Sequence, residues 1–257
     1  MPRRPRLFIP DQPQHIVVRG HNREPVLTRT EDFRFLYQCL RTAANQNSLA
    51  IHAWVFMHNH IHLLVTSPDK QSLPKTMQSI GRRYAQYFNQ TYHRSGSLWE
   101  GRYKSGLVDT EGYLLSCYRY IELNPIRAGI VKKPEDYAYS SYHANALGKP
   151  DSVVTPHSLF LEFTGAEVSE SNNDDHRLAD VADRNVDVTL EPSQLDSDTA
   201  IENVSESKKT DSDTRAIYRE LCAEVLDQKV LTQIRQGTEK GLGIGQADFL
   251  LKVASLR

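Results

Sequence analysis

The chain lacks any run of about 18 consecutive apolar residues, the length that a membrane-spanning helix requires. Its basic N-terminus is not followed by the apolar stretch of a signal peptide, so we expect no export. Cysteine is scarce: the three cysteines, Cys39, Cys117 and Cys222, are spaced for neither disulfides nor a zinc site. These absences predict a cytoplasmic protein with no membrane partner, whose cysteines are small buried apolar residues.

Evenly mixed charge is also missing, although the net charge of the whole chain is only −1. Residues 1–150 contain 20 Lys and Arg against 11 Asp and Glu, a net charge of +9. Residues 151–215 contain 5 against 16, a net charge of −11. A basic globular part predicts a polyanionic partner. The acidic part is rich in Ser, Asp, Asn and Glu and poor in aromatic residues, which predicts a disordered linker.

These differences divide the chain into three segments. We expect a catalytic domain over residues 1–160, an acidic linker over residues 161–213 and a small helical segment over residues 214–257. Apolar periodicity then predicts the elements of the first segment. They are a strand over 15–19, a helix over 31–47, a hairpin over 49–66, a helix over 72–92, a strand over 106–109 and a helix over 111–123. The order βαββαβα predicts an α+β fold with a ferredoxin-like antiparallel sheet and helices packed on it.

The hairpin contains the most informative motif, His60-Ile61-His62. On a strand, side chains two residues apart project from the same face, so His60 and His62 offer two imidazoles to one divalent metal ion. Two ligands do not complete a site, and an isolated motif of this kind is more often ordinary packing. A third ligand and a reacting group must come from another element.

The helix predicted over 111–123 supplies candidates for both. Helical periodicity places Tyr118 on its core face and Tyr120 with Asn124, one turn apart, on a flank. Asn124 can supply an oxygen ligand to a hard divalent ion, and the phenol of Tyr120 can act as a nucleophile. Tyr113 shares the face of Tyr120 and is the competing nucleophile. Glu122 points away from Tyr120, so we assign it no role as a general base.

Several motifs, in order, resemble a known family. His60-Ile61-His62 matches the HUH motif, and the run from Tyr120 to Asn124 matches the tyrosine helix of single-tyrosine HUH transposases. The segments 96–105, 119–129 and 137–142 are similar to the REP-associated tyrosine transposases in particular, and the likeness covers about residues 8–160. One departure is His58, where the family commonly has proline. We interpret His58 as a turn residue and His52 and His93 as structural or solvated.

The resemblance implies an activity, a set of site residues and a substrate. It implies a nuclease and strand transferase of single-stranded DNA that depends on Mg²⁺ or Mn²⁺ and acts through a 5′-phosphotyrosine intermediate. His60, His62 and Asn124 become the metal ligands and Tyr120 becomes the nucleophile. The substrate becomes single-stranded DNA with hairpin-forming repetitive extragenic palindromes. We expect a bacterial protein that associates with the nucleoid and is a monomer or a homodimer.

Basic residues near these motifs are the candidate DNA contacts, because basic side chains dominate affinity for nucleic acids. They are Arg3, Arg4, Arg6, Arg82, Arg83, Arg102, Lys104 and Arg127. Trp99 fits a core position better than a base-stacking one.

Two other functions and one regulatory idea stay open. A domesticated sequence-specific DNA-binding protein would keep the fold and do little chemistry, and a hydrolase of small phosphoesters would leave the charge of +9 unexplained. The acidic segment 165–213 forms a tethered polyanion that competes with DNA at low salt. By that idea, deleting residues 165–257 raises DNA affinity and cleavage, whereas a passive spacer changes neither.

Overall fold

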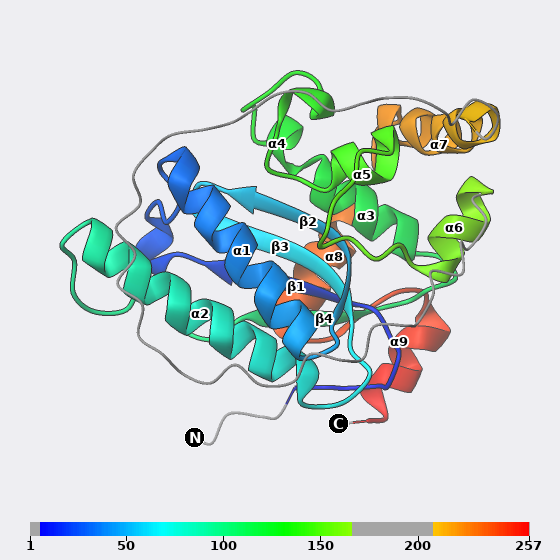
Figure 1. Ribbon diagram of the computed structural model, residues 1–257. Coiled ribbons are helices and arrows are strands. Elements are labelled where there is room, and N and C mark those ends of the chain that lie inside the picture. Colours follow the sequence, from blue (N-terminus) through cyan, green and yellow to red (C-terminus); the bar gives the residue numbers. More distant parts are fainter. Residues whose placement is uncertain (1–5, 166–207, 257) are drawn as a thin grey trace, which may run out of the picture.

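The computed structural model describes residues 6–165 and 208–256 (Figure 1). Arg3 and Arg4 therefore lie outside the described residues, as does most of the expected linker over residues 161–213. The domain boundaries and the autoinhibitory role of the acidic segment stay predictions. No helix within the described ranges has the length and apolar character needed to cross a membrane.

One five-stranded sheet forms the centre of the molecule, with the strand order β2-β3-β1-β4-β5. The strands are β1 (Gln14–Arg19), β2 (Ala50–Met57), β3 (His60–Thr66), β4 (Lys104–Val108) and β5 (Gly243–Ile244). The first four pair antiparallel, in the order of a ferredoxin-like βαββαβ unit, so the predicted α+β fold is confirmed. The strand β5 was not expected, and it pairs parallel to β4 at the edge of the sheet.

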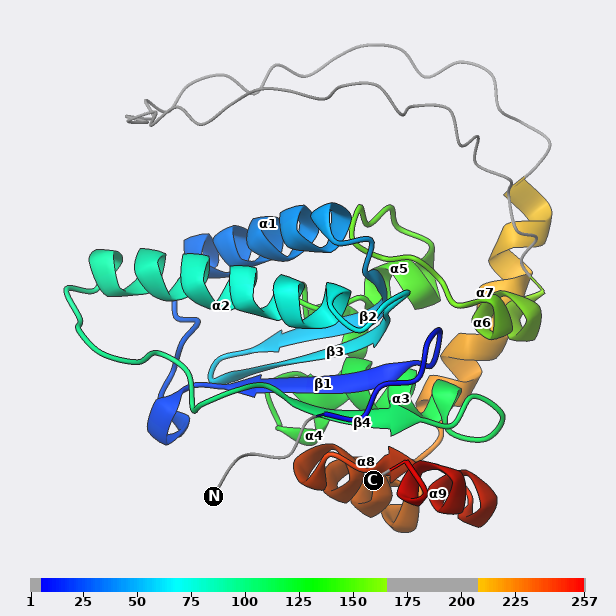
Figure 2. The same cartoon turned by 90° about the horizontal axis from the view of Figure 1, so that it is seen from below.

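Helices cover both faces of this sheet. The long helices α1 (Thr30–Gln46) and α2 (Ser72–Thr91) lie side by side on one face, and α3 (Leu114–Glu122) and α8 (Gln228–Lys240) lie on the other (Figure 2). The remaining helical elements are η1 (His21–Arg23), α4 (Asn124–Arg127), η2 (Pro134–Asp136), α5 (Tyr142–Leu147), α6 (Ser158–Thr164), α7 (Lys208–Ala223) and α9 (Ala247–Ala254).

The alternation of side chains along β3 divides the interior into two cores. Ile61, Leu63 and Val65 are buried against α1 and α2, whereas Leu64 is buried in the second core with α3 and α8. His62 alternates with Ile61 and Leu63, so it projects toward α3 and α8. The face of the sheet that holds the histidine motif is therefore the face that the C-terminal helices cover.

The helix predicted over 111–123 is shorter than expected and ends at Glu122. Pro125 has no amide hydrogen to continue the helical ladder, and the chain enters a new short helix, α4, at Asn124. Likewise, the chain breaks between two helices within the helical segment expected over 214–257, where α7 ends at Ala223 and α8 begins at Gln228. The carboxylate of Asp227 accepts the amide of Lys229 and starts α8 anew.

Two glycines let α8 pack closely on the sheet. A Cβ on Gly106, in β4, would lie 3.0 Å from the backbone nitrogen of Thr238 in α8. A Cβ on Gly237 would lie 2.6 Å from a side-chain atom of Ile244 in β5. Because neither position carries a side chain, α8 approaches β4 and β5 directly. The C-terminal segment is thus built into the same sheet as the predicted catalytic domain.

Candidate active site

His60 and His62 project together from β3, as the period of the strand predicts. Their ring centroids are 4.9 Å apart, with the rings edge to face. The strand is held between β1 and β2, so neither imidazole depends on a flexible loop for its position. His62 is 4% exposed.

Tyr120, on α3, lies against these imidazoles. Its ring centroid is 5.7 Å from that of His62 and 5.5 Å from that of His15 on β1. The guanidinium carbon of Arg127 lies 4.5 Å from the centroid of the Tyr120 ring, and Arg127 also donates to the Tyr120 carbonyl oxygen. Within the described residues, the Tyr120 hydroxyl forms no hydrogen bond, which leaves its oxygen available to a reacting group.

A chain of hydrogen bonds leads from His62 to α8. His62 Nδ1 lies 2.8 Å from His15 Nε2, and His15 Nδ1 lies 2.7 Å from Thr238 Oγ1. The Thr238 hydroxyl donates to the Ile234 carbonyl at 2.8 Å, so it is able to accept from His15 Nδ1. His15 Nε2 then accepts from His62 Nδ1. With these donors, the proton of His62 resides on Nδ1, and Nε2 retains its lone pair.

His60 reaches the same protonation pattern by a local contact. Its Nδ1 lies 2.6 Å from the side-chain oxygen of Asn59, which can only accept. The proton is therefore on Nδ1, and Nε2 again keeps its lone pair. Both imidazoles of the motif thus offer the nitrogen that a metal ion needs, and a hydrogen bond fixes each ring.

Burial keeps these rings neutral. Desolvation lowers the pKa of His60 to about 4, with the charge of Arg19 adding to the shift. Desolvation, followed by the neighbouring His15 and His60, lowers the pKa of His62 well below its usual range. Desolvation also lowers the pKa of His15 to about 3. Neutral imidazole is the form that binds metal, so ligation needs no prior loss of a proton at neutral pH.

A cavity of about 330 Å³ opens beside His62 and Tyr120, with its far wall built by α8. Arg19 and Arg235 line it. Desolvation lowers the pKa of Arg127 to about 10, and the neighbouring charge of Arg235 adds to the shift. Arg127 remains protonated at neutral pH, so three guanidinium groups surround the tyrosine. Such a field favours a phosphate group in the cavity.

Asn124 lies next to Tyr120 but in a different helix. Its Nδ2 donates to the Tyr120 carbonyl oxygen at 3.0 Å, which leaves the side-chain oxygen for another partner. No hydrogen bond joins Asn124 to His60 or His62 in the described part of the chain. No cluster of three His, Cys, Asp or Glu side chains suited to a metal ion exists among residues 6–165 and 208–256. Asn124 as third ligand stays a prediction.

The candidate DNA contacts fall into different environments. Arg82, Arg83 and Arg102 are exposed. Arg6 stacks on Tyr103, with 3.6 Å between the guanidinium carbon and the ring centroid. Lys104 forms an exposed ion pair with Glu239 of α8. Arg127 belongs to the tyrosine site itself.

The other residues weighed from the sequence have structural partners. Tyr113 donates to Gln233 of α8, and Tyr118 is fully buried. Glu122 is fully buried away from the cavity and accepts from Ser141, Asn145 and Tyr218. His58 lies in the turn between β2 and β3 and contacts the Leu27 carbonyl.

Sequence reasoning missed His15, Thr238 and Arg235. A partial signal exists, because His15, Val17 and Arg19 share one face of a strand. Only the register, in which Val17 pairs with His62, shows that this face is the one holding the histidine motif. Thr238 follows His15 by 223 positions, and no local pattern links the two.

In sequence, the chain resembles known transposases. Residues 10–124 match the family model described as "Transposase IS200 like". A REP-associated tyrosine transposase of Escherichia coli K12 is 25% identical over 141 residues, which cover 54% of this chain and 81% of that protein. A putative REP-associated tyrosine transposase of Haemophilus influenzae is 26% identical over 101 residues and covers 33% of this chain and 54% of that protein. A solved REP-associated tyrosine transposase bound to a REP hairpin aligns with a TM-score of 0.49 at 21% identity, over 62% of this chain and 96% of that one.

Proposed function

We propose that this chain, whose residues 10–124 match the model of the IS200-like transposases, cleaves and rejoins single strands of DNA with Tyr120 as the attacking group. The observation that carries the proposal is the position of the Tyr120 ring. It lies 5.7 Å from His62, beside a cavity with Arg19 and Arg235 in its wall. A nucleophile, a pair of metal-competent imidazoles and a cationic pocket for phosphate therefore meet in one place.

The covalent step exchanges one ester for another. The hydroxyl oxygen of Tyr120 attacks the phosphorus of a phosphodiester and forms a new P–O bond. The bond from phosphorus to the 3′-oxygen breaks, and that oxygen leaves as a hydroxyl with a proton from solvent, while the phenolic proton passes to solvent. The 5′-phosphotyrosine keeps the energy of the ester bond. A second 3′-hydroxyl can therefore reverse the reaction and join two strands.

Arg127 assists this step through its charge. Its guanidinium lies over the Tyr120 ring and holds the backbone of that residue through the carbonyl oxygen. A fixed positive charge beside the phenol favours the phenolate that develops during attack, and little of this interaction is screened because Arg127 is partly buried.

The donor atoms fit a divalent ion. His60 and His62 each present a neutral Nε2, and Asn124 has a side-chain oxygen without a partner in the described structure. A bound Mg²⁺ or Mn²⁺ would supply Lewis-acid polarisation of the scissile phosphate. The residues themselves set the orientation, because Asn59 and His15 fix the two rings. We propose the three as the ligand set.

The names of the relatives indicate the substrate. The Escherichia coli relative is REP-associated, and we propose hairpin-forming repetitive extragenic palindromes as the DNA that this chain acts on. The basic charge of residues 1–150 fits a polyanion of this kind.

A pair of tyrosine variants tests the proposal. Tyr120→Phe should bind a hairpin oligonucleotide with a single-stranded extension as the wild type does and form no covalent adduct on a denaturing gel. Tyr113→Phe is the matched control, because its hydroxyl contacts Gln233, and it should keep the adduct. Adducts that persist in Tyr120→Phe and disappear in Tyr113→Phe would move the nucleophile to Tyr113. Tight binding by a wild-type protein that never forms an adduct would favour the domesticated DNA-binding protein.

A further inference from the structure

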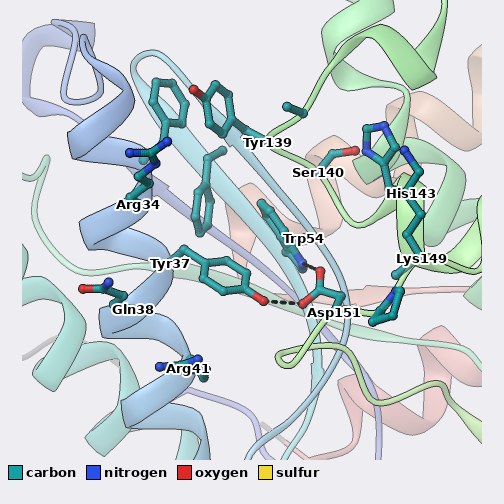
Figure 3. A pocket seen from close by; sticks show the side chains of 15 residues that line it. Arg34, Tyr37, Gln38, Arg41, Trp54, Tyr139, Ser140, His143, Lys149 and Asp151 are labelled. Atoms are coloured by element: carbon teal, nitrogen blue, oxygen red, sulfur yellow. Dashed lines mark hydrogen bonds between the residues drawn. The ribbon is translucent and has the colours of Figure 1, made fainter. Parts of the chain in front are cut away.

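A second cavity lies away from Tyr120, on the other face of the sheet. It measures about 640 Å³ and lies between α1 and the segment 138–151 (Figure 3). Trp54 and Phe56 of β2 form its floor, and both belong to the core under α1 and α2. His62 projects from the opposite face. The cavity is therefore separate from the tyrosine site, and its size lies within the range of about 300–1,000 Å³ of ligand sites.

Aromatic rings line this cavity from both sides. Tyr37 of α1 lies 5.5 Å from Trp54, ring centroid to ring centroid. On the far side, Tyr139 stacks on Phe33 with 3.8 Å between the centroids. Tyr37 and Tyr139 are partly exposed, so their faces are available to a flat ligand. Tyr139 lies in the 137–142 motif, which the tyrosine chemistry does not use.

Cations border the same cavity. Arg34 and Arg41 extend from α1, about one turn before and one turn after Tyr37, and Lys149 extends from the facing loop (Figure 3). The side chains of all three are exposed and form no ion pair or hydrogen bond within residues 6–165 and 208–256. None of the three side chains therefore stabilises the described part of the fold through a polar contact.

The carboxylate in the cavity does not neutralise these cations. Asp151 Oδ1 accepts from the Tyr37 hydroxyl at 2.6 Å and from the Val153 amide at 2.9 Å. Asp151 Oδ2 accepts from the Trp54 indole nitrogen at 2.9 Å. Asp151 thus holds the rings of Tyr37 and Trp54 in place. The cavity has three positively charged side chains and one negatively charged one, and the latter is hydrogen-bonded to these rings.

We propose that this cavity binds a segment of single-stranded DNA, with one unpaired base against Tyr37 and Tyr139 and the flanking phosphates on Arg34, Arg41 and Lys149. Aromatic faces with adjacent cations are the general means by which proteins hold single strands. A base within a duplex is stacked on its neighbours and has no free face to offer, so the occupant is unpaired. The inference rests on the proposed DNA substrate and adds a second contact on it, remote from the bond that Tyr120 attacks.

Paired charge variants test the site. Affinity for a fluorescent eight-nucleotide thymidine strand is measured by anisotropy in EDTA, for Arg34→Gln/Arg41→Gln and for the control Lys70→Gln/Lys75→Gln. The control removes two exposed cations near the start of α2, on the same face of the sheet. The first pair should weaken binding about tenfold or more and lower the slope of log affinity against log salt by about 1.4, since each phosphate contact on a single strand contributes about 0.7. The control should change affinity less than twofold. Equal losses in both pairs would mean diffuse charge attraction and overturn the site.

Trp54 provides a second readout. The chain has two tryptophans, so Trp99→Phe leaves Trp54 as the reporter. Its emission should change on saturation with the single strand, and the change should be lost in Tyr139→Leu when thermal melting shows that the variant is folded. A duplex of equal length, or free thymidine monophosphate, that gives the same response at the same concentration overturns the commitment to a single strand. An unchanged emission at saturation overturns the site.

The two proposals fail separately. Tyr120→Phe should leave the Trp54 signal intact, because the two cavities lie on opposite faces. A wild-type chain that gives the Trp54 response but no covalent adduct rejects the cleavage chemistry and keeps the second cavity. A wild-type chain that forms the adduct while Arg34→Gln/Arg41→Gln binds normally rejects the second cavity and keeps the chemistry.

Discussion

Two buried histidines on neighbouring strands, His52 and His62, differ in whether a ring nitrogen is left for a metal ion. Each is under 5% exposed and lies about 5 Å from a second imidazole, edge to face, with His157 beside His52 and His60 beside His62. Desolvation lowers both pKa values, that of His52 to about 4. The two sites are therefore alike in residue type, in the distance between the two rings and in burial.

They differ in their hydrogen bonds. His52 is the extra residue of a β-bulge in β2, and both of its nitrogens are occupied, Nδ1 by the Thr155 carbonyl and Nε2 by the Thr66 hydroxyl. His62 uses only Nδ1, on His15, and keeps Nε2. A histidine becomes a ligand when its partners satisfy one nitrogen and leave the other. His52 is therefore held at both ring nitrogens, whereas His62 is held at one and keeps the other for a further partner.

The sharpest way to break this comparison is to truncate each histidine. His62→Ala should abolish Mn²⁺ binding in the absence of DNA, because it removes a ligand, and His60→Ala should do the same. His52→Ala should bind Mn²⁺ as the wild type does but lose about 1–3 kcal/mol of unfolding free energy, because it removes two partly buried hydrogen bonds. Calorimetric titration and thermal melting measure the two effects. Mn²⁺ binding that survives in His62→Ala would remove this histidine from the ligand set.

The hydrogen-bond chain behind His62 gives the next largest effect. Thr238→Val keeps the shape of the side chain but removes the acceptor for His15 Nδ1, so His62 no longer has a fixed tautomer. We expect about a 10–100-fold loss of Mn²⁺ affinity. Thr232→Val is the matched control, since Thr232 is exposed on the same helix and its hydroxyl likewise donates to the carbonyl four residues earlier. Nitrogen-15 spectra should show His62 protonated on Nδ1 in the wild type. Protonation of His62 on Nε2 would contradict the donor and acceptor order assigned to the hydrogen bonds from His62 to Thr238.

The pH dependence of stability distinguishes the structural histidine. The pKa of His52 falls to about 4 in the folded protein from an ordinary value near 6.5, first through desolvation. Its stabilising contribution is therefore complete above about pH 6.5 and is lost as the pH falls toward 4. Between these two pH values, the unfolding free energy of His52→Gln should depend on pH less steeply than that of the wild type, by up to about 1.4 kcal/mol per pH unit. Identical slopes in denaturant titrations of both proteins would show that His52 does not titrate in this way.

The smallest expected effect concerns the acidic segment. Because Thr238 belongs to the site and β5 to the sheet, deleting residues 165–257 would disrupt both and test nothing about inhibition. Replacing residues 166–207 by a neutral Gly/Ser linker of equal length removes 12 Asp and Glu against 2 Arg. Affinity for single-stranded DNA should rise severalfold at low salt and not at high salt. An unchanged affinity at low salt would identify a passive spacer.

The sequence was informative wherever the signal was local. The period of two placed His60 and His62 on one face, the period of 3.6 residues placed Tyr118 in the core, and the order of elements predicted the four-stranded sheet. The same period predicted Tyr120 on a flank, but Tyr120 is buried too, at 5% exposure. It failed where the information lies in pairing between distant segments. The two-residue β5 carries no periodicity of its own, and the role of His15 depends on the register of β1 with β3. The break before Asn124 was signalled by Pro125, but its effect on the ligand could not be read from a helical wheel.

The pairing of His15 with Thr238 has a consequence for synthesis. A ribosome makes the histidine motif and the tyrosine within the first half of the chain, but the hydroxyl that anchors His15 emerges only near the end. An incomplete product that lacks α8 therefore contains Tyr120 and His62 without the hydroxyl that anchors His15. The proposed site is thus completed only after α8 has been synthesised.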